Sequence, residues 1–145
     1  MTGHHFISYS RREAQAQELA LRLYEELRSG SPAFAMWLDK RDIRLGREYD
    51  DEIAEAIDAC RSVLFVMSRD SVTPQSGCKW EWTRARNRKK AIIPILLHFD
   101  AERPMMLGNR QHIDFTEAIE PALAELRRHL HWLSSPAGVL QDVFE

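Results

Sequence analysis

Cysteine is scarce in this sequence. Only Cys60 and Cys78 occur among the 145 residues, and their spacing matches no metal-binding pattern. So few cysteines are typical of a reducing compartment, and we therefore expect a cytoplasmic protein. Long apolar runs are lacking too, since none approaches the roughly 20 residues that cross a membrane. The chain enters a strand-like run directly after residues 1–3, which predicts neither a signal peptide nor a membrane partner.

An excess of charge of one sign is also lacking. The chain has 20 basic and 22 acidic residues and a net charge of −2, which argues against a nucleic-acid partner. Apolar residues make up 44% and charged residues 29%, the balance of a soluble globular protein. A length of 145 residues suits one domain. We assign that domain to residues 1–133 and expect residues 134–145 to be a linker or the start of a following domain.

The common nucleotide-binding and catalytic motifs are missing as well. There is no Gly-x-Gly-x-x-Gly sequence and no phosphate-binding loop, because the first predicted strand leads into Ser10-Arg11-Arg12. The histidines show no zinc spacing, and no Ser-His-Asp set can be proposed. We therefore expect no metal and no bound cofactor. A response-regulator function is disfavoured, because the first strand does not end in a pair of acidic residues.

What the sequence does contain is a regular alternation of strand-like and helix-like segments. Apolar runs typical of buried strands occupy residues 4–9, 34–38, 63–67, 91–97 and 112–115. Apolar residues recur at helical spacing within residues 16–27, 49–60, 78–85 and 122–130. This alternation implies an α/β fold with a parallel sheet and right-handed crossovers. Because ligands bind such sheets beyond the carboxyl ends of the strands, we expect the functional site in the loops there.

Three local features refine this picture. Ser10 and Glu13 have the spacing of a capping box, which predicts that the serine caps the first helix. Pro94 lies within the fourth strand but cannot donate a hydrogen bond to a sheet, which predicts a strand end or an edge. Pro121 is expected in the first turn of the last helix.

Glu81 is the most distinctive polar residue. If the helix is numbered from Cys78 at 100° per residue, Cys78, Trp82 and Ala85 form one apolar stripe, and Glu81 lies about 60° from Cys78. A carboxylate beside an apolar stripe is unusual unless it faces a cavity. From the residues alone, a simple role in complementing the positive end of the helix dipole is the commoner explanation.

The tryptophans and a basic cluster allow two interpretations each. Trp37 could stack on a ligand ring, although a core tryptophan is the commoner case. Trp80 points away from the Cys78 stripe and could serve a protein interface. The basic cluster resembles a nucleic-acid patch, but it lies mostly in the last helical turns, where cations favour the helix dipole, so a solvated face is expected. Its members are Arg84, Arg86, Arg88, Lys89 and Lys90.

Three segments together resemble the box motifs of a TIR (Toll/interleukin-1 receptor) domain, with the bacterial branch as the closer match. They are Phe6-Ile-Ser-Tyr-Ser10, Trp37-Leu-Asp-Lys-Arg-Asp-Ile43 with Gly46, and Val63-Leu-Phe-Val-Met-Ser68 followed by Cys78-x-x-Glu81. The resemblance covers residues 4–131. It implies a flavodoxin-like, three-layer fold with a central five-stranded parallel sheet, so that residues 1–133 form a TIR domain.

The resemblance also implies an activity. In catalytically active TIR domains, the glutamate of the Trp-Cys-x-x-Glu pattern is essential for cleaving NAD⁺ at the nicotinamide–ribose bond, and Cys78 and Glu81 match that pattern. Gly77 departs from it, because many bacterial members have tryptophan there, and Glu13 replaces a frequent aspartate. We therefore predict an NAD⁺ nucleosidase, with NAD⁺ as substrate and Glu81 as catalytic residue. Its products are nicotinamide and either ADP-ribose or a cyclic form, and its setting is bacterial antiphage defence.

The parallel-sheet rule and the resemblance together suggest which residues bind NAD⁺. These residues follow the first three strands or open the Glu81 helix. Arg11 could meet the pyrophosphate, and Trp37 could pack on a ring. An ordinary solvated charge is an equally good interpretation of Arg11. The predicted substrate-binding residues are Ser10, Arg11, Trp37, Leu45, Ser71 and Cys78.

The charged loop at residues 39–48 corresponds, by resemblance, to the BB loop through which TIR domains pack head to tail. Such heterologous contacts do not close on themselves and so grow into filaments. We predict activation by self-assembly with other TIR domains, triggered by a sensor or regulatory domain beyond residue 145. The alternative interpretation is that this loop is a solvated connection and that the monomer is active alone. The alternative function is a non-catalytic TIR–TIR interaction module in signalling. The predicted assembly residues are Asp39, Arg41, Asp42, Ile43, Gly46 and Trp80.

Overall fold

The computed structural model describes residues 3–39, 46, 48–108, 110–136 and 138 and contains a five-stranded parallel sheet. The strands are β1 (His5–Ser8), β2 (Met36–Trp37), β3 (Ser62–Met67), β4 (Ala91–Leu96) and β5 (Ile113–Asp114). They lie in the order β2-β1-β3-β4-β5, and every neighbouring pair is parallel. This is the flavodoxin-like strand order, so the predicted fold class is confirmed.

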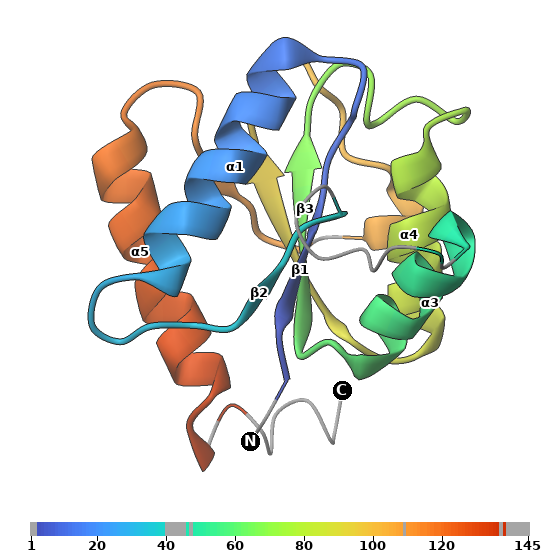
Figure 1. The fold of residues 1–145 in the computed structure, drawn as a ribbon. Helices are drawn as coiled ribbons and strands as arrows, with labels where there is room; N and C mark the ends of the chain where they lie inside the picture. The colour runs from blue at the N-terminus through green and yellow to red at the C-terminus, as the bar shows by residue number, and fades with distance from the viewer. Residues whose placement is uncertain (1–2, 40–45, 47, 109, 137, 139–145) are drawn as a thin grey trace.

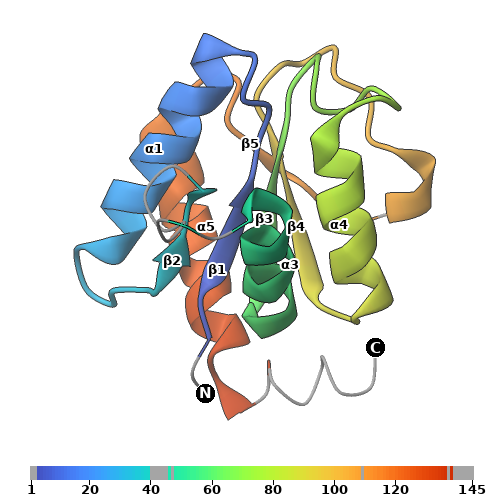
Figure 2. The ribbon, with the colours of Figure 1, turned by 45° about the vertical axis from the view of Figure 1, so that its right-hand side comes forward.

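Helices cover both faces of the sheet and complete the three layers. They are α1 (Ala14–Arg28), α3 (Tyr49–Ala59), α4 (Gly77–Asn87) and α5 (Ile119–Leu133), with a short 3₁₀ turn, η1, at Met105–Leu107. Helices α1 and α5 lie on one face, whereas α3 and α4 lie on the other (Figures 1 and 2). Among the described residues, no helix is long and apolar enough to cross a membrane.

The apolar periodicity of the sequence explains which helix faces are buried. The α1 residues at helical spacing, such as Leu19, Leu23 and Leu27, are at most 5% exposed and pack with α5 on one side of the sheet. On the other side, Ile53 and Ile57 of α3 join the α4 stripe. Alternation along β1 serves both cores, because successive strand residues point to opposite faces. Burial of these two stripes fixes the positions of α1 and α4 relative to the sheet.

Two local predictions differ from the structure. The capping box is wrong: Glu13 itself is the N-cap residue of α1 and makes no side-chain cap bond, and the Ser10 hydroxyl donates to Asp70 instead. Pro94 is neither at a strand end nor in an edge strand, since β4 lies between β3 and β5. It is tolerated there because β5 pairs with β4 only at Ile95 and Leu96, beyond the proline. The side of Pro94 that faces away from β3 therefore needs no backbone donor.

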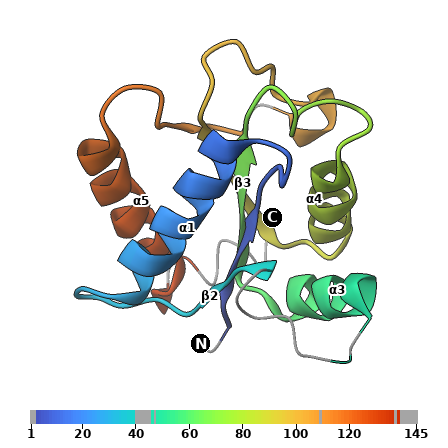
Figure 3. The same ribbon diagram turned by 45° about the horizontal axis from the view of Figure 1, so that its top comes forward.

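The topology brings the loops after β1 and β3 together. The chain leaves β1 through α1 to reach β2 on one side, and β3 lies on the other side of β1. The strand order reverses at this point, which is where open α/β sheets bind ligands. In Figure 3, with the top of the molecule turned forward, the loop after β1 runs beside the loop after β3. The hydrogen bond from Ser10 to Asp70, 2.5 Å long, joins these loops directly.

Candidate functional site

Glu81 lies on the inner face of α4, beside the point where the strand order reverses. Helix α4 begins at Gly77, with the Ser76 hydroxyl accepting the N–H of Cys78 at 3.1 Å, so Glu81 falls just beyond the first turn. Its side chain is only 2% exposed, and those of its neighbours Cys78 and Trp82 in the apolar stripe are 1% and 2% exposed. A carboxylate that merely complemented the helix dipole would remain in solvent within the first turn. The burial of Glu81 instead indicates a specific environment for its charge.

Two side chains from the first strand and its loop hold the Glu81 carboxylate. The Ser8 hydroxyl donates to Oε1 at 2.6 Å, and Nη2 of Arg11 donates to Oε2 at 2.9 Å. Burial raises the pKa of Glu81, and the Arg11 charge and the Ser8 hydrogen bond oppose that rise. The buried carboxylate is thus stabilised by a partly exposed cation and a hydroxyl.

Arg11 also connects Glu81 to Asp39, and we call these three residues the Glu81–Arg11–Asp39 network. Nε of Arg11 donates to Oδ2 of Asp39. Asp39 also accepts hydrogen bonds from the hydroxyls of Tyr9, at 2.7 Å, and Tyr49, at 2.6 Å. The guanidinium lies 5.5 Å from the centre of the Tyr9 ring and 5.6 Å from that of Tyr49. Asp39 is the first residue of the charged loop and Tyr49 directly follows its last, so the network and the Tyr49 hydrogen bond connect both ends of the loop to Glu81.

The electrostatics of the network favour ionised side chains for Asp39 and Arg11. Burial alone would raise the pKa of Asp39, but the hydrogen bonds from Tyr49 and Arg11 outweigh it and hold that pKa below its usual value. Burial alone would lower the pKa of Arg11, whereas Glu81 and Asp39 raise it. One cation therefore sits between two carboxylates.

A small cavity of about 150 Å³ adjoins the network. It lies between the loop after β1, the loop after β3 and the start of α4, and Ser10, Arg11 and Cys78 are among its lining residues. A Cβ atom added at Gly77 would meet no atom within 4 Å, so the cavity wall is open at this position. Burial raises the pKa of Cys78 to about 11, which leaves the thiol protonated and unreactive at neutral pH.

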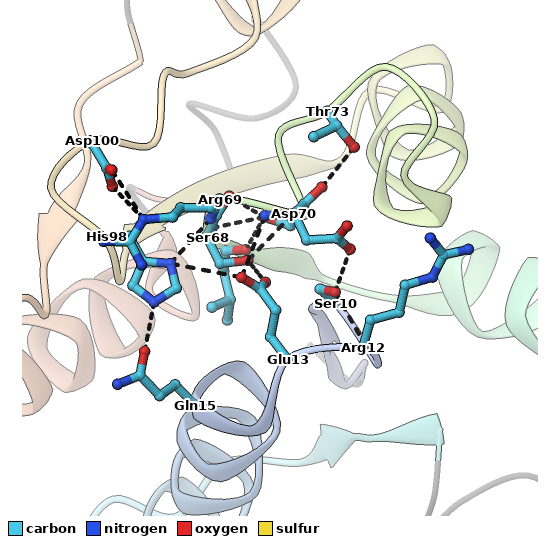
Figure 4. Close-up of polar contacts among 12 residues, drawn as sticks. Ser10, Arg12, Glu13, Gln15, Ser68, Arg69, Asp70, Thr73, His98 and Asp100 are labelled. Carbon is cyan, nitrogen blue, oxygen red and sulfur yellow. Dashed lines mark hydrogen bonds and ion pairs between the residues drawn. The ribbon is translucent and has the colours of Figure 1, made fainter.

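A second set of polar contacts fixes the loops around this cavity (Figure 4). Glu13, at the start of α1, accepts a hydrogen bond from the Ser68 hydroxyl and a longer one, 3.4 Å, from the N–H of Asp70. His98 accepts the N–H of Arg69 at Nδ1, 3.1 Å away, so Nε2 carries the proton and donates to Gln15 at 2.7 Å. Glu13 thus positions the loop after β3 rather than completing a helix cap.

The remaining predicted site residues lie in different surroundings. Ser71 is buried, and its hydroxyl donates to the Val66 carbonyl at 2.7 Å, closing the turn after β3. Trp37 is 9% exposed, and its ring stacks on Phe6 at a centroid distance of 4.9 Å, within the core. The structure therefore brings Ser10, Arg11 and Cys78 to the cavity, while it places Trp37 in the apolar layer below.

The predicted assembly residues fall partly outside the described ranges. Arg41, Asp42 and Ile43, together with the predicted substrate-binding residue Leu45, lie there. Gly46 has a φ of +80°, a conformation that glycine adopts without strain. Trp80 is 46% exposed, as expected for a residue on the outer face of α4.

Sequence reasoning missed Ser8 and the two tyrosines, Tyr9 and Tyr49, that donate hydrogen bonds to Asp39 of the network. A usable signal for Ser8 was present, because Ser8 and Phe6 point to the same face of β1, where the packing partners are apolar. A hydroxyl at such a position needs a buried acceptor, and Glu81 supplies it. Asp39 was assigned to assembly alone, because no local pattern links it to Arg11. Within the described residues, no group of three or more His, Cys, Asp or Glu side chains could hold a metal.

The fold and this site define a flavodoxin-like domain with a buried carboxylate at the point where the strand order of its sheet reverses. A family model described as the TIR domain matches residues 6–130. The chain therefore belongs to the TIR domain family.

Known proteins with TIR domains are similar to this chain at different levels of sequence identity. Toll-like receptor 2 of Ovis aries is 34% identical over 142 residues, which cover 92% of this chain but 18% of the receptor. The TIR domain of the Toll-related receptor TRR-2 from Hydra magnipapillata superposes with a TM-score of 0.67 at 22% identity, over 90% of this chain and 99% of that one. The TIR domains of the activated Roq1 resistosome give a TM-score of 0.70 at 12% identity, over 89% and 99%. These structures show the shared fold, and the bacterial branch stays a prediction.

Proposed function

We propose that this domain cleaves NAD⁺ at the nicotinamide–ribose bond, with Glu81 as the catalytic carboxylate. The observation that carries the proposal is the burial of Glu81 at the reversal point of the sheet, between a hydroxyl at 2.6 Å and a guanidinium at 2.9 Å. Buried carboxylates with a shifted pKa, placed where the strand order of a sheet reverses, are typical of catalytic sites. The family includes NAD⁺ hydrolases as well as signalling modules, which gives this chemistry a precedent in the same fold.

One carboxylate is sufficient for this reaction. The nicotinamide of NAD⁺ is already cationic, so it leaves with both electrons of the C–N bond and needs no general acid. The ribose then carries positive charge, as in the oxocarbenium-like state of glycosidases. An ionised Glu81 stabilises that charge electrostatically. Water captures the cation and loses a proton to give ADP-ribose, or a nitrogen of the adenine captures it to give a cyclic product.

Substrate access requires a rearrangement of Arg11. The guanidinium contacts Glu81, and the adjoining cavity of about 150 Å³ is smaller than the roughly 300–1,000 Å³ typical of ligand sites. Movement of Arg11 away from Glu81 would free the carboxylate and present the guanidinium to the pyrophosphate, which it can bind in a bidentate manner. Ser10 and Cys78 line the same cavity and are the next candidates for substrate contact.

The network suggests how self-assembly activates the enzyme. Asp39 begins the charged loop and Tyr49 follows it. Asp39 accepts a hydrogen bond from Arg11 directly, and Tyr49 is connected to Arg11 through Asp39. A neighbouring TIR domain that binds this loop would shift both anchors and so release Arg11 from Glu81. The exposed Trp80 offers a further contact surface on α4. A sensor domain that clusters the chains would then switch on NAD⁺ cleavage in the cytoplasm, as suits a bacterial antiphage effector.

Free nicotinamide released from NAD⁺ by the purified domain tests the proposal. We expect turnover that rises with protein concentration and is abolished by Glu81→Gln, which keeps the shape of the side chain but removes its charge. Glu125→Gln makes the same change on the exposed face of α5 and should retain activity. Turnover by a well-folded Glu81→Gln protein at the wild-type rate would contradict the catalytic assignment.

The second candidate is a TIR domain that only binds other TIR domains. It is favoured by the pairing of Glu81 with Arg11, because a buried ion pair can be purely structural. The two functions differ in outcome: a wild-type protein that assembles but releases no nicotinamide at any concentration is an interaction module.

A further inference from the structure

The fold divides the basic cluster at the end of α4 between two surfaces. Arg84 and Arg88 face α3, where Asp58 accepts from Nη2 of Arg84 at 2.8 Å and from Nε of Arg88 at 3.1 Å. These two residues therefore form a solvent-exposed face with an ion-paired partner, as expected from the sequence. The other three cations lie elsewhere and line a cavity together with a further arginine. They are Arg86, Lys89, Lys90 and Arg110.

This basic cavity has a volume of about 510 Å³ and lies at the amino edge of the sheet. It is bordered by the carboxyl ends of α4 and α5 and by the residues that lead into β4 and β5, at the end of the molecule opposite the Glu81 site (Figures 1 and 2). None of the described lining residues is acidic. Its size falls within the roughly 300–1,000 Å³ of small-molecule sites, and its charge favours an anion.

An aromatic surface borders the same cavity. The rings of His129 and Trp132, on the last turns of α5, stack with centroids 5.8 Å apart and an interplanar angle of 23°. Trp132 remains 41% exposed, although large aromatic side chains are usually buried. An exposed indole beside several cations offers a flat surface on which a heteroaromatic base can stack.

The backbone at Lys89 is the third observation. Its φ of +58° makes it the one non-glycine residue with positive φ within the described residues. The turn ends α4, with the N–H of Lys89 donating to Arg86 at 3.0 Å and that of Lys90 to Ala85 at 2.9 Å. Glycine is the favoured residue at this position of a helix end, and lysine adopts it at a conformational cost. Such an outlier beside a cavity points to a function for the side chain.

We propose that this cavity binds a nucleoside phosphate, with the base on Trp132 and the phosphates held by Lys89, Lys90 and the two arginines. A bare phosphate would use neither the aromatic surface nor the volume. A nucleic acid would need a longer basic track than this chain, with its net charge of −2, provides. The site is separate from Glu81, so binding to it can be measured without reference to NAD⁺ cleavage.

Calorimetric titration of the 145-residue chain with ATP, adenosine and inorganic triphosphate tests the site. We expect ATP to bind at least about ten-fold more tightly than either fragment, because only ATP uses both halves of the cavity. Lys89→Gly with Lys90→Gln should weaken ATP binding by about ten-fold or more. The matched control, Arg84→Gln with Arg88→Gln, removes two charges from the same helix end and should change binding less than about two-fold.

Two single variants separate binding from folding. Lys89→Gly should weaken ATP binding while keeping or raising the thermal midpoint, since glycine relieves the backbone cost. Trp132→Ala should weaken ATP binding but not triphosphate binding, and Trp132→Phe should restore most of it. An equal loss in the Arg84/Arg88 control, or triphosphate binding as tight as that of ATP, would overturn the proposal. Tighter binding of a single-stranded oligonucleotide, lost with the same lysines, would replace it by a nucleic-acid site.

Discussion

Replacement of Arg11 by methionine isolates the cost of keeping Glu81 charged in the core. Methionine keeps the length of the aliphatic stem but leaves a carboxylate that is 2% exposed with only the Ser8 hydroxyl as a described partner. Removal of one partner from a buried ion pair costs about 3–5 kcal/mol. Because the Arg11 side chain is 29% exposed, solvent screens part of the interaction, and we expect about 2–3 kcal/mol at pH 8. For a domain of this size, that lowers the Tm by roughly 4–10 °C.

The loss should depend on pH in a defined direction. Burial raises the pKa of Glu81 above the unfolded value of 4.5, and removal of Arg11 takes away the largest opposing influence. The folded variant then binds a proton that the unfolded chain releases. The penalty is therefore absent below pH 4.5 and grows as the pH rises through the folded pKa of Glu81. The difference in Tm between wild type and Arg11→Met should accordingly be smaller at pH 5 than at pH 8.

Calorimetric Tm values of a double-mutant cycle complete the test. Adding Glu81→Gln to Arg11→Met removes the unpaired charge. It should restore at least about 1 kcal/mol of the free energy of unfolding at pH 8 and abolish the pH dependence of the loss. Arg12→Met removes a neighbouring, exposed guanidinium and should cost less than about 0.5 kcal/mol. An Arg11→Met protein equally destabilised at pH 5 and pH 8, and not rescued by Glu81→Gln, would refute the reasoning.

Two further predictions concern assembly and the loop after β3. The specific activity of NAD⁺ cleavage should rise with protein concentration or with a crowding agent. Gly46→Pro, which forbids the φ of +80°, and Trp80→Ala should both lower it. A specific activity that does not change with the concentration of a monomeric protein would exclude assembly as the switch. Glu13→Ala should lower the free energy of unfolding by about 1–3 kcal/mol, because it frees the Ser68 hydroxyl and the Asp70 N–H, whereas Asp58→Ala, which breaks exposed pairs, should cost below about 1 kcal/mol in the same urea titration.

The fold was predictable because its information is local and periodic. Apolar residues repeat at helical spacing in α1, and short apolar runs such as Val63–Met67 fill the strands, so element type and order follow from the sequence alone. The strand order does not follow from such periodicity, and it entered through the resemblance to TIR domains. Pro94 shows the limit: its tolerance depends on where β5 begins to pair, which no local pattern records.

The site was predictable where helix geometry alone determined it. Numbering the helix placed Glu81 beside the Cys78 stripe, and the structure finds it buried there. The contacts of Ser10 and Glu13 failed as a local prediction because both side chains bind the loop after β3, some 55 residues or more along the chain. The division of the basic cluster between Asp58 and a cavity likewise depends on the neighbours that the fold supplies.

The pairing of Glu81 with Arg11 constrains any substrate of the proposed reaction. A buried Glu81 without a cation has a raised pKa and tends to take up a proton, yet stabilisation of the ribose cation needs the ionised form. A substrate that takes the place of Arg11 beside Glu81 must therefore bring positive charge of its own. The nicotinamide ring of NAD⁺ does so before the bond breaks, and the ribose carries the charge afterwards. The reduced dinucleotide offers neither a cation nor a good leaving group, so the site that holds Arg11 at rest should accept NAD⁺ and reject NADH.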